Sequence, residues 1–91
     1  MALFDHGETV ATPGALALLE SLGISPSTLL DRHCSGDWGD LDDDDKKAND
    51  DALRSGKDRI FSSYVVAPGQ KVWVITEWNR SVTTLLLPSE Y

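Results

Sequence analysis

The sequence predicts an α+β fold in which two or three N-terminal helices pack on a C-terminal three-stranded antiparallel β-meander. Residues 12–55 contain repeated helix-start signals, and residues 58–88 contain three strand-like runs separated by turn residues. Three Trp, two Tyr and two Phe can anchor a core. Because a chain of 91 residues builds one core, we expect residues 1–91 to form a single domain.

The first helix is predicted from its two ends. Thr12 and Pro13 suit the N-cap and the first helical position, and Gly23 suits the residue that ends a helix. The residues between them are apolar around most of the helix circumference, so we expect this helix to be largely buried. A second start signal predicts a short helix over residues 26–33 that buries Leu29 and Leu30.

A third helix is predicted from residue 41 or 42 to residue 54. Aspartates in its first turn suit the positive end of the helix dipole, and Gly56 can end the helix. Its apolar side is thin and includes Ala48 and Ala52. We therefore expect this helix to lie on the surface with its aspartates in water.

The pattern after Gly56 is typical of strands. Residues 59–66 and 71–78 flank a hairpin-type connection that contains Pro and Gly, and a tight turn at Asn79 leads into residues 81–87. Alternating residues of a strand point to opposite faces of the sheet. One face receives Val72, Val74 and Thr76, and the other receives Trp73, Ile75 and Glu77. Residues 8–11 form a further short extended piece.

Nearly all of the net charge lies in one segment. Residues 37–51 contain eight aspartates and two lysines, so they carry −6 of the total of −7. A concentrated negative field favours basic protein surfaces as partners and disfavours nucleic acid, whose phosphates it repels. We therefore expect a protein partner with a basic surface and no direct nucleic-acid binding. The candidate binding residues are Asp42, Asp43, Asp44, Asp45, Trp38, Arg32 and Arg80.

No cofactor or metal is predicted. The run Asp42–Asp45 is not an EF-hand loop, because it has no glycine at the sixth position and no closing glutamate. Cys34 is the only cysteine, which excludes an intramolecular disulfide and a cysteine-based zinc site and favours a reducing compartment. The N-terminal residues do not form a signal peptide, and no apolar run could cross a membrane. We expect a cytoplasmic protein that does not bind membranes.

A small set of residues could perform acid–base chemistry. His33, Asp37 and Glu77 are the candidate catalytic residues, with histidine and carboxylate in the roles of base and acid. The alternative is structural: Trp38 fills the core, Asp40 caps the third helix, and Arg32 pairs with an aspartate. His33 and Cys34 are neighbours in sequence and point in different directions on a helix, so they do not form a nucleophile–base pair.

Several short motifs together resemble a family of short bacterial proteins carried on plasmids and other mobile elements. They include the segments 10–16, 36–41, 73–77, 80–84 and 87–91, together with Arg32-His33 and Arg59-Ile60, and they cover nearly the whole chain. The resemblance implies a mobile-element setting without a defined biochemistry. Members of this family are often described as related to type I restriction-modification, but 91 residues cannot contain a methyltransferase domain.

We favour an interaction module over an enzyme. In this interpretation the chain is a small acidic protein-binding module of mobile-element origin that inhibits or modulates a nucleic-acid-handling or defence protein. The alternative is a small metal-assisted or acid–base hydrolase or nuclease that uses His33 and nearby carboxylates. A third hypothesis is an oligomer formed by pairing of an edge strand of the meander.

Overall fold

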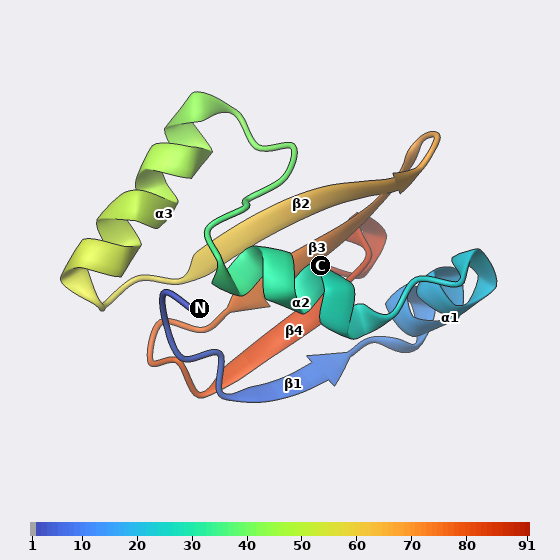
Figure 1. Ribbon diagram of the computed structural model, residues 1–91, viewed down its shortest axis with the longest axis horizontal. Helices are drawn as coiled ribbons and strands as arrows, with labels where there is room; N and C mark the ends of the chain where they lie inside the picture. The colour runs from blue at the N-terminus through green and yellow to red at the C-terminus, as the bar shows by residue number, and fades with distance from the viewer. Residues whose placement is uncertain (1) are drawn as a thin grey trace.

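A computed structural model describes residues 2–91 and shows three helices and a four-stranded mixed sheet (Figure 1). The elements in chain order are β1 (Glu8–Ala11), α1 (Pro13–Leu22), α2 (Pro26–Cys34), α3 (Asp43–Ser55), β2 (Ile60–Ala67), β3 (Gln70–Thr76), β4 (Val82–Leu86) and a 3₁₀ helix, η1 (Pro88–Glu90). The strands lie in the order β1-β4-β3-β2. The α+β class is therefore confirmed.

The prediction of three antiparallel strands is wrong in one respect. β2, β3 and β4 form the expected antiparallel meander, but β1 adds a fourth strand that runs parallel to β4. All three helices lie in the chain between β1 and β2, so helices and strands are interleaved. A parallel pair needs a long crossover connection, and a four-residue strand carries no local signal of such pairing.

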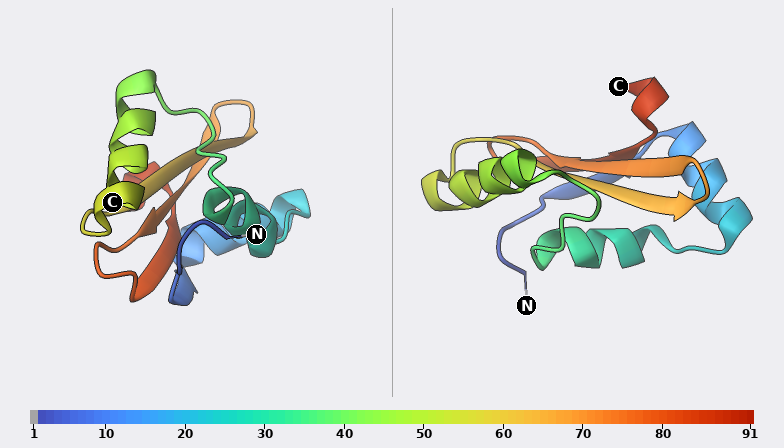
Figure 2. Two further views of the ribbon diagram at one scale, coloured as in Figure 1. Left: turned by 60° about the vertical axis from the view of Figure 1, so that its left-hand side comes forward. Right: turned by 90° about the horizontal axis from the view of Figure 1, so that it is seen from above.

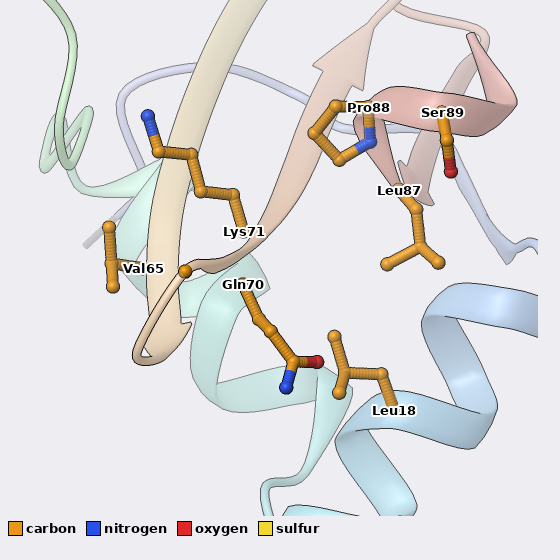
Figure 3. A pocket seen from close by; sticks show the side chains of 8 residues that line it. Leu18, Val65, Gln70, Lys71, Leu87, Pro88 and Ser89 are labelled. Carbon is orange, nitrogen blue, oxygen red and sulfur yellow. The ribbon is translucent and has the colours of Figure 1, made fainter.

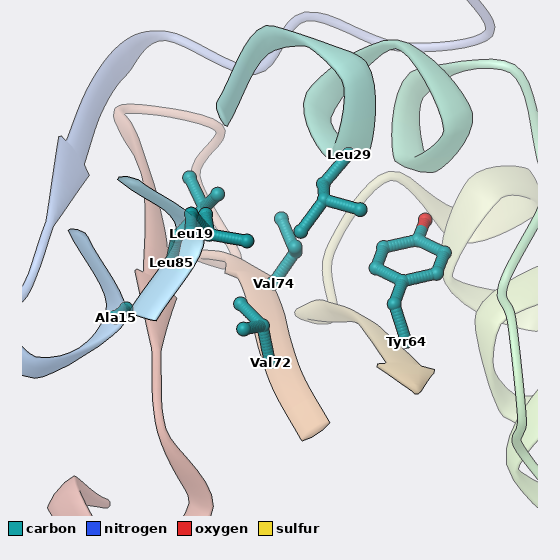
Figure 4. Packing of buried hydrophobic residues seen from close by; sticks show 7 residues of the cluster. All are labelled: Ala15, Leu19, Leu29, Tyr64, Val72, Val74 and Leu85. Atoms are coloured by element: carbon teal, nitrogen blue, oxygen red, sulfur yellow. The ribbon is translucent and has the colours of Figure 1, made fainter. Parts of the chain in front are cut away.

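Helices α1 and α2 cover one face of the sheet (Figure 2). The apolar core lies between these two helices and the sheet (Figure 4). Its buried residues are Ala15, Leu19, Leu29, Tyr64, Val72, Val74 and Leu85. Val72, Val74 and Thr76 of β3 are all buried on this face, as the alternation predicts. The expectation that α1 is largely buried is wrong: only Ala15 and Leu19 are buried, and Leu16 is 46% exposed and Leu22 39% exposed. The reason is that α1 packs with one side on β4 and leaves its other side in water.

A second apolar cluster joins α3 to the outer strand of the sheet. Trp38, Ala52 and Ile60 form its buried centre. Asn49 of α3 is also buried; its Nδ2 donates to the Phe61 carbonyl at 2.6 Å, and its Oδ1 accepts from the Phe61 N–H at 3.0 Å. Ala48, which we placed on the apolar side, is exposed. The Asn49 side chain therefore makes the two main-chain hydrogen bonds that a neighbouring strand would make at Phe61.

The loop before α3 covers the rest of the outer edge of β2. The Ser63 N–H donates to the Trp38 carbonyl at 3.1 Å, and the Asp40 N–H donates to the Ser63 carbonyl at 2.7 Å. The carboxylate of Asp40 then accepts from the Val65 N–H at 3.0 Å. The outward-facing N–H groups of Phe61, Ser63 and Val65 therefore all have hydrogen-bond acceptors outside the sheet. This edge is therefore closed to pairing with a second copy of the chain.

Gly39 allows the loop to approach β2 this closely. Its φ is +73°, and a Cβ at this position would lie 2.1 Å from the Ser63 carbonyl oxygen. We predict that Gly39→Ala lowers the free energy of unfolding by more than about 3 kcal/mol, because backbone strain and a backbone clash add together. Gly56→Ala is the matched control, since Gly56 has φ +68° and open space around it. That change should cost only about 1 kcal/mol. Urea denaturation measures both, and equal losses would contradict the proposed close approach.

Candidate functional site

The predicted site residues fall into separate groups and do not share one pocket. Arg32 and His33 lie in the last turn of α2, where His33 is buried under the sheet. Asp37 and Trp38 belong to the loop that follows α2, and Arg80 lies at the turn between β3 and β4. The aspartates Asp42–Asp45 lie at the start of α3.

Arg32 and Asp37 fix the loop after α2. The Arg32 Nε donates to the Asp37 Oδ2 at 2.7 Å, and its guanidinium lies 4.4 Å from the centre of the Tyr64 ring. The Tyr64 hydroxyl donates to the Asp37 carbonyl at 2.6 Å. The hydrogen bond from Arg32 holds the pKa of the Asp37 carboxyl below its usual value. Asp37 is therefore ionised and helps to hold the loop. Its role as a catalytic acid remains a prediction from the sequence.

The other structural assignments to this loop are mixed. Trp38 is 6% exposed and fills the second apolar cluster, as the structural alternative predicted. Asp40 does not cap α3, because its carboxylate is used by the Val65 N–H. Asp42 is the N-cap instead, and its Oδ1 accepts from the Asp45 N–H at 2.8 Å.

His33 is fully buried in a chain of hydroxyl groups. Its Nδ1 lies 2.6 Å from the Ser62 Oγ, and its Nε2 lies 2.9 Å from the Thr76 Oγ1. The Thr76 Oγ1 lies 2.6 Å from the Thr83 Oγ1, which donates to the His6 carbonyl at 2.7 Å. Four side chains from α2, β2, β3 and β4 are thus linked.

The acceptor at the end of this chain fixes the direction of the hydrogen bonds from Thr83 back to the Nε2 of His33. A carbonyl can only accept, so the Thr83 hydroxyl donates to the carbonyl of His6 and accepts from Thr76. Thr76 must then accept from the Nε2–H of His33. Because burial lowers the pKa of His33 well below neutral pH, the ring carries one proton only, and the remaining nitrogen, Nδ1, accepts from the Ser62 hydroxyl. His33 is therefore a neutral imidazole that carries its proton on Nε2.

Burial lowers the pKa of His33 to about 4, with a smaller contribution from the charge of His6. A neutral imidazole that accepts from a serine hydroxyl is the arrangement that activates a serine nucleophile. Here both groups are fully buried, so a substrate has no access to them. The present arrangement stabilises the fold and does not support acid–base catalysis at His33.

Glu77 lies on the other side of the sheet from His33. Thr76 points toward His33, and successive residues of a strand point to opposite faces. Glu77 instead lines an open depression of about 510 Å³, together with Arg59, Ile75, Thr84, Leu86, Glu90 and Tyr91. The sheet therefore separates the two residues that we considered as acid and base.

Arg80 binds main-chain carbonyl groups and makes no ion pair with Glu77. Its guanidinium donates to the carbonyls of Asp58 at 2.6 Å, Trp78 at 3.1 Å and Ala52 at 3.1 Å. The Ala52 carbonyl is in the last turn of α3, so Arg80 ties that helix to the β3–β4 turn. Arg80 also has φ +61°, which is rare for a residue with a side chain.

Six aspartates of the acidic segment have no ion pair among residues 2–91. Asp37 is paired with Arg32, and Asp51 is paired with Arg54. Of these six, Asp40 and Asp42 accept hydrogen bonds from main-chain N–H groups. The other four are exposed: Asp43, Asp44, Asp45 and Asp50. A cleft of about 400 Å³ lies beside them, between α3 and the start of β2. Its lining consists of Asp45, Ala48, Asn49, Asp51, Asp58, Arg59 and Phe61.

The cleft combines carboxylates with apolar surface. Asp45 and Asp58 bring two unpaired carboxylates to it, and Asp51 brings a third that is paired with Arg54. Ala48 and the Phe61 ring bring apolar groups. Arg59, the one basic residue in the lining, donates to the Tyr91 hydroxyl at 2.9 Å. The cleft can therefore receive a long cationic side chain, whose carbon stem needs apolar contact and whose head needs carboxylates.

Sequence reasoning missed Asn49, Ser62 and Thr83, which are all buried. A signal for two of them was present, because Ser62 and Thr83 alternate with apolar residues that face the core. A hydroxyl group on an inward-facing strand position needs a buried partner. Asn49 gave a weaker signal, as a polar residue three positions before Ala52 on the packed side of α3.

Among residues 2–91, no three histidine, cysteine, aspartate or glutamate side chains are grouped so that they could hold a metal ion. In the same part of the chain, no helix has the length and apolar character needed to span a membrane. Comparisons with protein-family models, with curated proteins and with solved structures find no match. Functional assignment therefore depends on the geometry alone.

We predict that stability falls as the pH is lowered from about 7 to about 5. The unfolded chain takes up a proton on His33 below pH about 6.5, whereas the folded protein does so only near its pKa of about 4. This difference lowers the free energy of unfolding by about 2 kcal/mol over that range. Urea denaturation at several pH values measures it.

The His6→Gln variant is the control, because it leaves His33 as the only histidine. The same pH dependence should persist in this variant. An NMR titration in which the His33 ring becomes protonated near pH 6.5 would show that the ring is not held neutral by burial.

We also predict that Arg80→Lys lowers the free energy of unfolding by about 2 kcal/mol. An ammonium group cannot reproduce the fork of donors that reaches four carbonyl groups in α3, in the loop before β2 and in the β3–β4 turn. Arg59→Lys is the matched control and should cost less than about 0.5 kcal/mol, because Arg59 is exposed. If urea denaturation gives the same loss for both variants, the role assigned to Arg80 is wrong.

Proposed function

We propose that this protein is an interaction module that binds a basic surface of another protein through α3 and the cleft beside it. The observation that carries the proposal is the cleft between α3 and β2, with three carboxylates around apolar surface. An arginine or lysine side chain of a partner fits this chemistry, because its stem can contact Ala48 and Phe61 while its charge meets the aspartates.

The charge around the cleft supports the same proposal. Asp43, Asp44 and Asp50 lie on the same helix and have no ion pair among residues 2–91, so their field adds to that of the cleft. A field of one sign speeds the approach of an oppositely charged partner. It also repels phosphates, which disfavours direct binding of nucleic acid.

The attachment of α3 to the sheet favours binding. Asn49 holds the middle of the helix to β2, and Arg80 holds its last turn to the β3–β4 turn. A helix that is already fixed loses little conformational entropy when a partner binds. Its carboxylates are therefore presented as a surface of defined shape.

The partner class that we favour is a basic protein that handles nucleic acid, including a defence protein, with this chain as its inhibitor or modulator. The resemblance to short proteins of plasmids and mobile elements supports an anti-defence role in the cytoplasm. The support for the hydrolase or nuclease alternative is weaker, because His33 has no access to solvent and Glu77 lies beyond the sheet.

The prediction is tested with a basic probe peptide, acetyl-Ala-Arg-Arg-Ala-Arg-Arg-Ala-amide, and isothermal calorimetry at low salt. The triple variant Asp45→Asn, Asp51→Asn and Asp58→Asn should weaken binding by about tenfold, because three exposed charge pairs are lost. Binding to the unchanged protein should also weaken as salt rises from about 50 mM to about 500 mM.

The control triple variant is Glu8→Gln, Glu20→Gln and Asp31→Asn, which removes three exposed carboxylates elsewhere. It makes the same change in net charge and should weaken binding by less than about threefold. Equal weakening in the two variants would mean that the peptide responds to net charge and not to the cleft.

A further inference from the structure

A second groove lies at the α1 end of the sheet, away from α3 (Figures 1 and 3). Its volume is about 450 Å³. The groove is bounded by α1, by the β2–β3 hairpin and by the segment that leaves β4, and most of its lining is apolar. The lining residues are Leu18, Val65, Gly69, Gln70, Lys71, Leu87, Pro88 and Ser89.

The groove exists because β3 extends beyond β4. The pairing of these strands ends at Trp73 and Leu86, whereas β3 itself begins at Gln70. Two residues after Leu86, Pro88 begins η1 and carries the chain away from the sheet. Within residues 2–91, the edge of β3 before Trp73 therefore has no neighbouring strand on the β4 side; we call this position the empty track. Pro88 has no N–H, so it cannot donate the next hydrogen bond of the ladder.

The main chain of Lys71 points into this empty track. Lys71 is the cross-strand partner of Val65, and the Val65 N–H points outward to Asp40. In an antiparallel pair of this kind both residues direct their N–H and C=O groups away from each other. The N–H and C=O of Lys71 therefore face the β4 side, where no described residue pairs with them.

Apolar side chains flank the free main-chain groups. Leu18 of α1 and Leu87 lie on one side of the gap, and Gln70 extends toward Leu18 from the hairpin on the other side (Figure 3). Val65 is 51% exposed on the other side of β3. An unpaired strand edge between apolar walls offers backbone hydrogen bonds and side-chain contacts to the same ligand.

We propose that this groove binds an extended, apolar peptide segment of a partner protein, which adds as a short strand beside Lys71. One residue of the segment exchanges two main-chain hydrogen bonds with Lys71, and its neighbours contact Leu18 and Leu87. The charge of the groove adds a preference: Lys71 is its one charged lining residue, so an acidic residue next to the apolar ones is favoured. This site is separate from the cleft at α3.

The test uses the probe peptide acetyl-Asp-Val-Leu-Val-Asp-amide and the complete protein, with binding followed by ¹⁵N–¹H NMR. The amide signals of Lys71 and of residues 86–89 that carry an N–H should shift, with those of α3 unchanged. The same peptide methylated on the leucine nitrogen should bind about fivefold more weakly, because it has lost the donor for the Lys71 carbonyl.

Two substitutions at one position separate backbone pairing from charge. Lys71→Pro removes the free N–H and leaves the pairing of β3 with β2 intact, because the Lys71 N–H faces away from β2. It should weaken binding about fivefold, whereas Lys71→Ala, which keeps the N–H, should weaken it less than about twofold. Leu18→Asp tests the apolar wall at a half-buried position of α1 that packs against the core, and it should also abolish the shifts.

The signals of Val72 and Val74 report whether each variant keeps the sheet. Equal affinity for the methylated and unmethylated peptides would overturn the proposal, since the groove would then bind apolar side chains without main-chain hydrogen bonds. A loss in Lys71→Ala as large as that in Lys71→Pro would overturn it as well, because the ammonium would then be the recognised group.

Discussion

The closure of the outer edge of β2 is the constraint on which most of the structure depends. Three groups from outside the sheet supply the hydrogen bonds that a fifth strand would make: the Asn49 amide at Phe61, the Trp38–Asp40 main chain at Ser63, and the Asp40 carboxylate at Val65. An unpaired edge is open to aggregation, and here the covering groups also position a helix and a loop. The place of the acidic segment follows from this closure.

The buried hydroxyl chain around His33 plays a similar part on the helix-covered face. It connects α2 to β2, β3 and β4 through side chains whose hydrogen bonds are all directional. An apolar core tolerates small shifts between a helix and a sheet, but a satisfied polar chain does not, because a shift would leave a buried group unpaired. His33 therefore selects one register of α2 against the sheet.

The features that could be predicted from the sequence are those with local causes. Thr12, Pro13 and Gly23 define the ends of α1 because capping chemistry involves only neighbouring residues. Likewise, the two faces of β3 follow from simple alternation. The parallel pairing of β1 with β4 could not be predicted in this way, since its partners are more than seventy positions apart and β1 has four residues.

The candidate site was predictable in composition but not in arrangement. Arg32, His33 and Asp37 are close in the sequence, yet α2 directs His33 into the core and leaves Arg32 at the surface. A step of one residue along the helix is enough to separate Arg32 from His33, because side chains one position apart point in directions about 100° apart. Glu77 is separated from His33 for a different reason. Successive residues of a strand point to opposite faces of the sheet, so Glu77 lies on the face opposite to Thr76 and His33.

The aspartates of the acidic segment divide into structural and available groups. Asp37 and Asp40 hold the loop, Asp42 caps α3, and Asp51 is paired with Arg54. Those that remain are concentrated in the first turn of α3, where the positive end of the helix dipole stabilises them even without a partner. The free protein can therefore keep an unneutralised acidic surface at little cost in stability, and a basic partner finds these carboxylates exposed to water on a helix that is already held to the sheet.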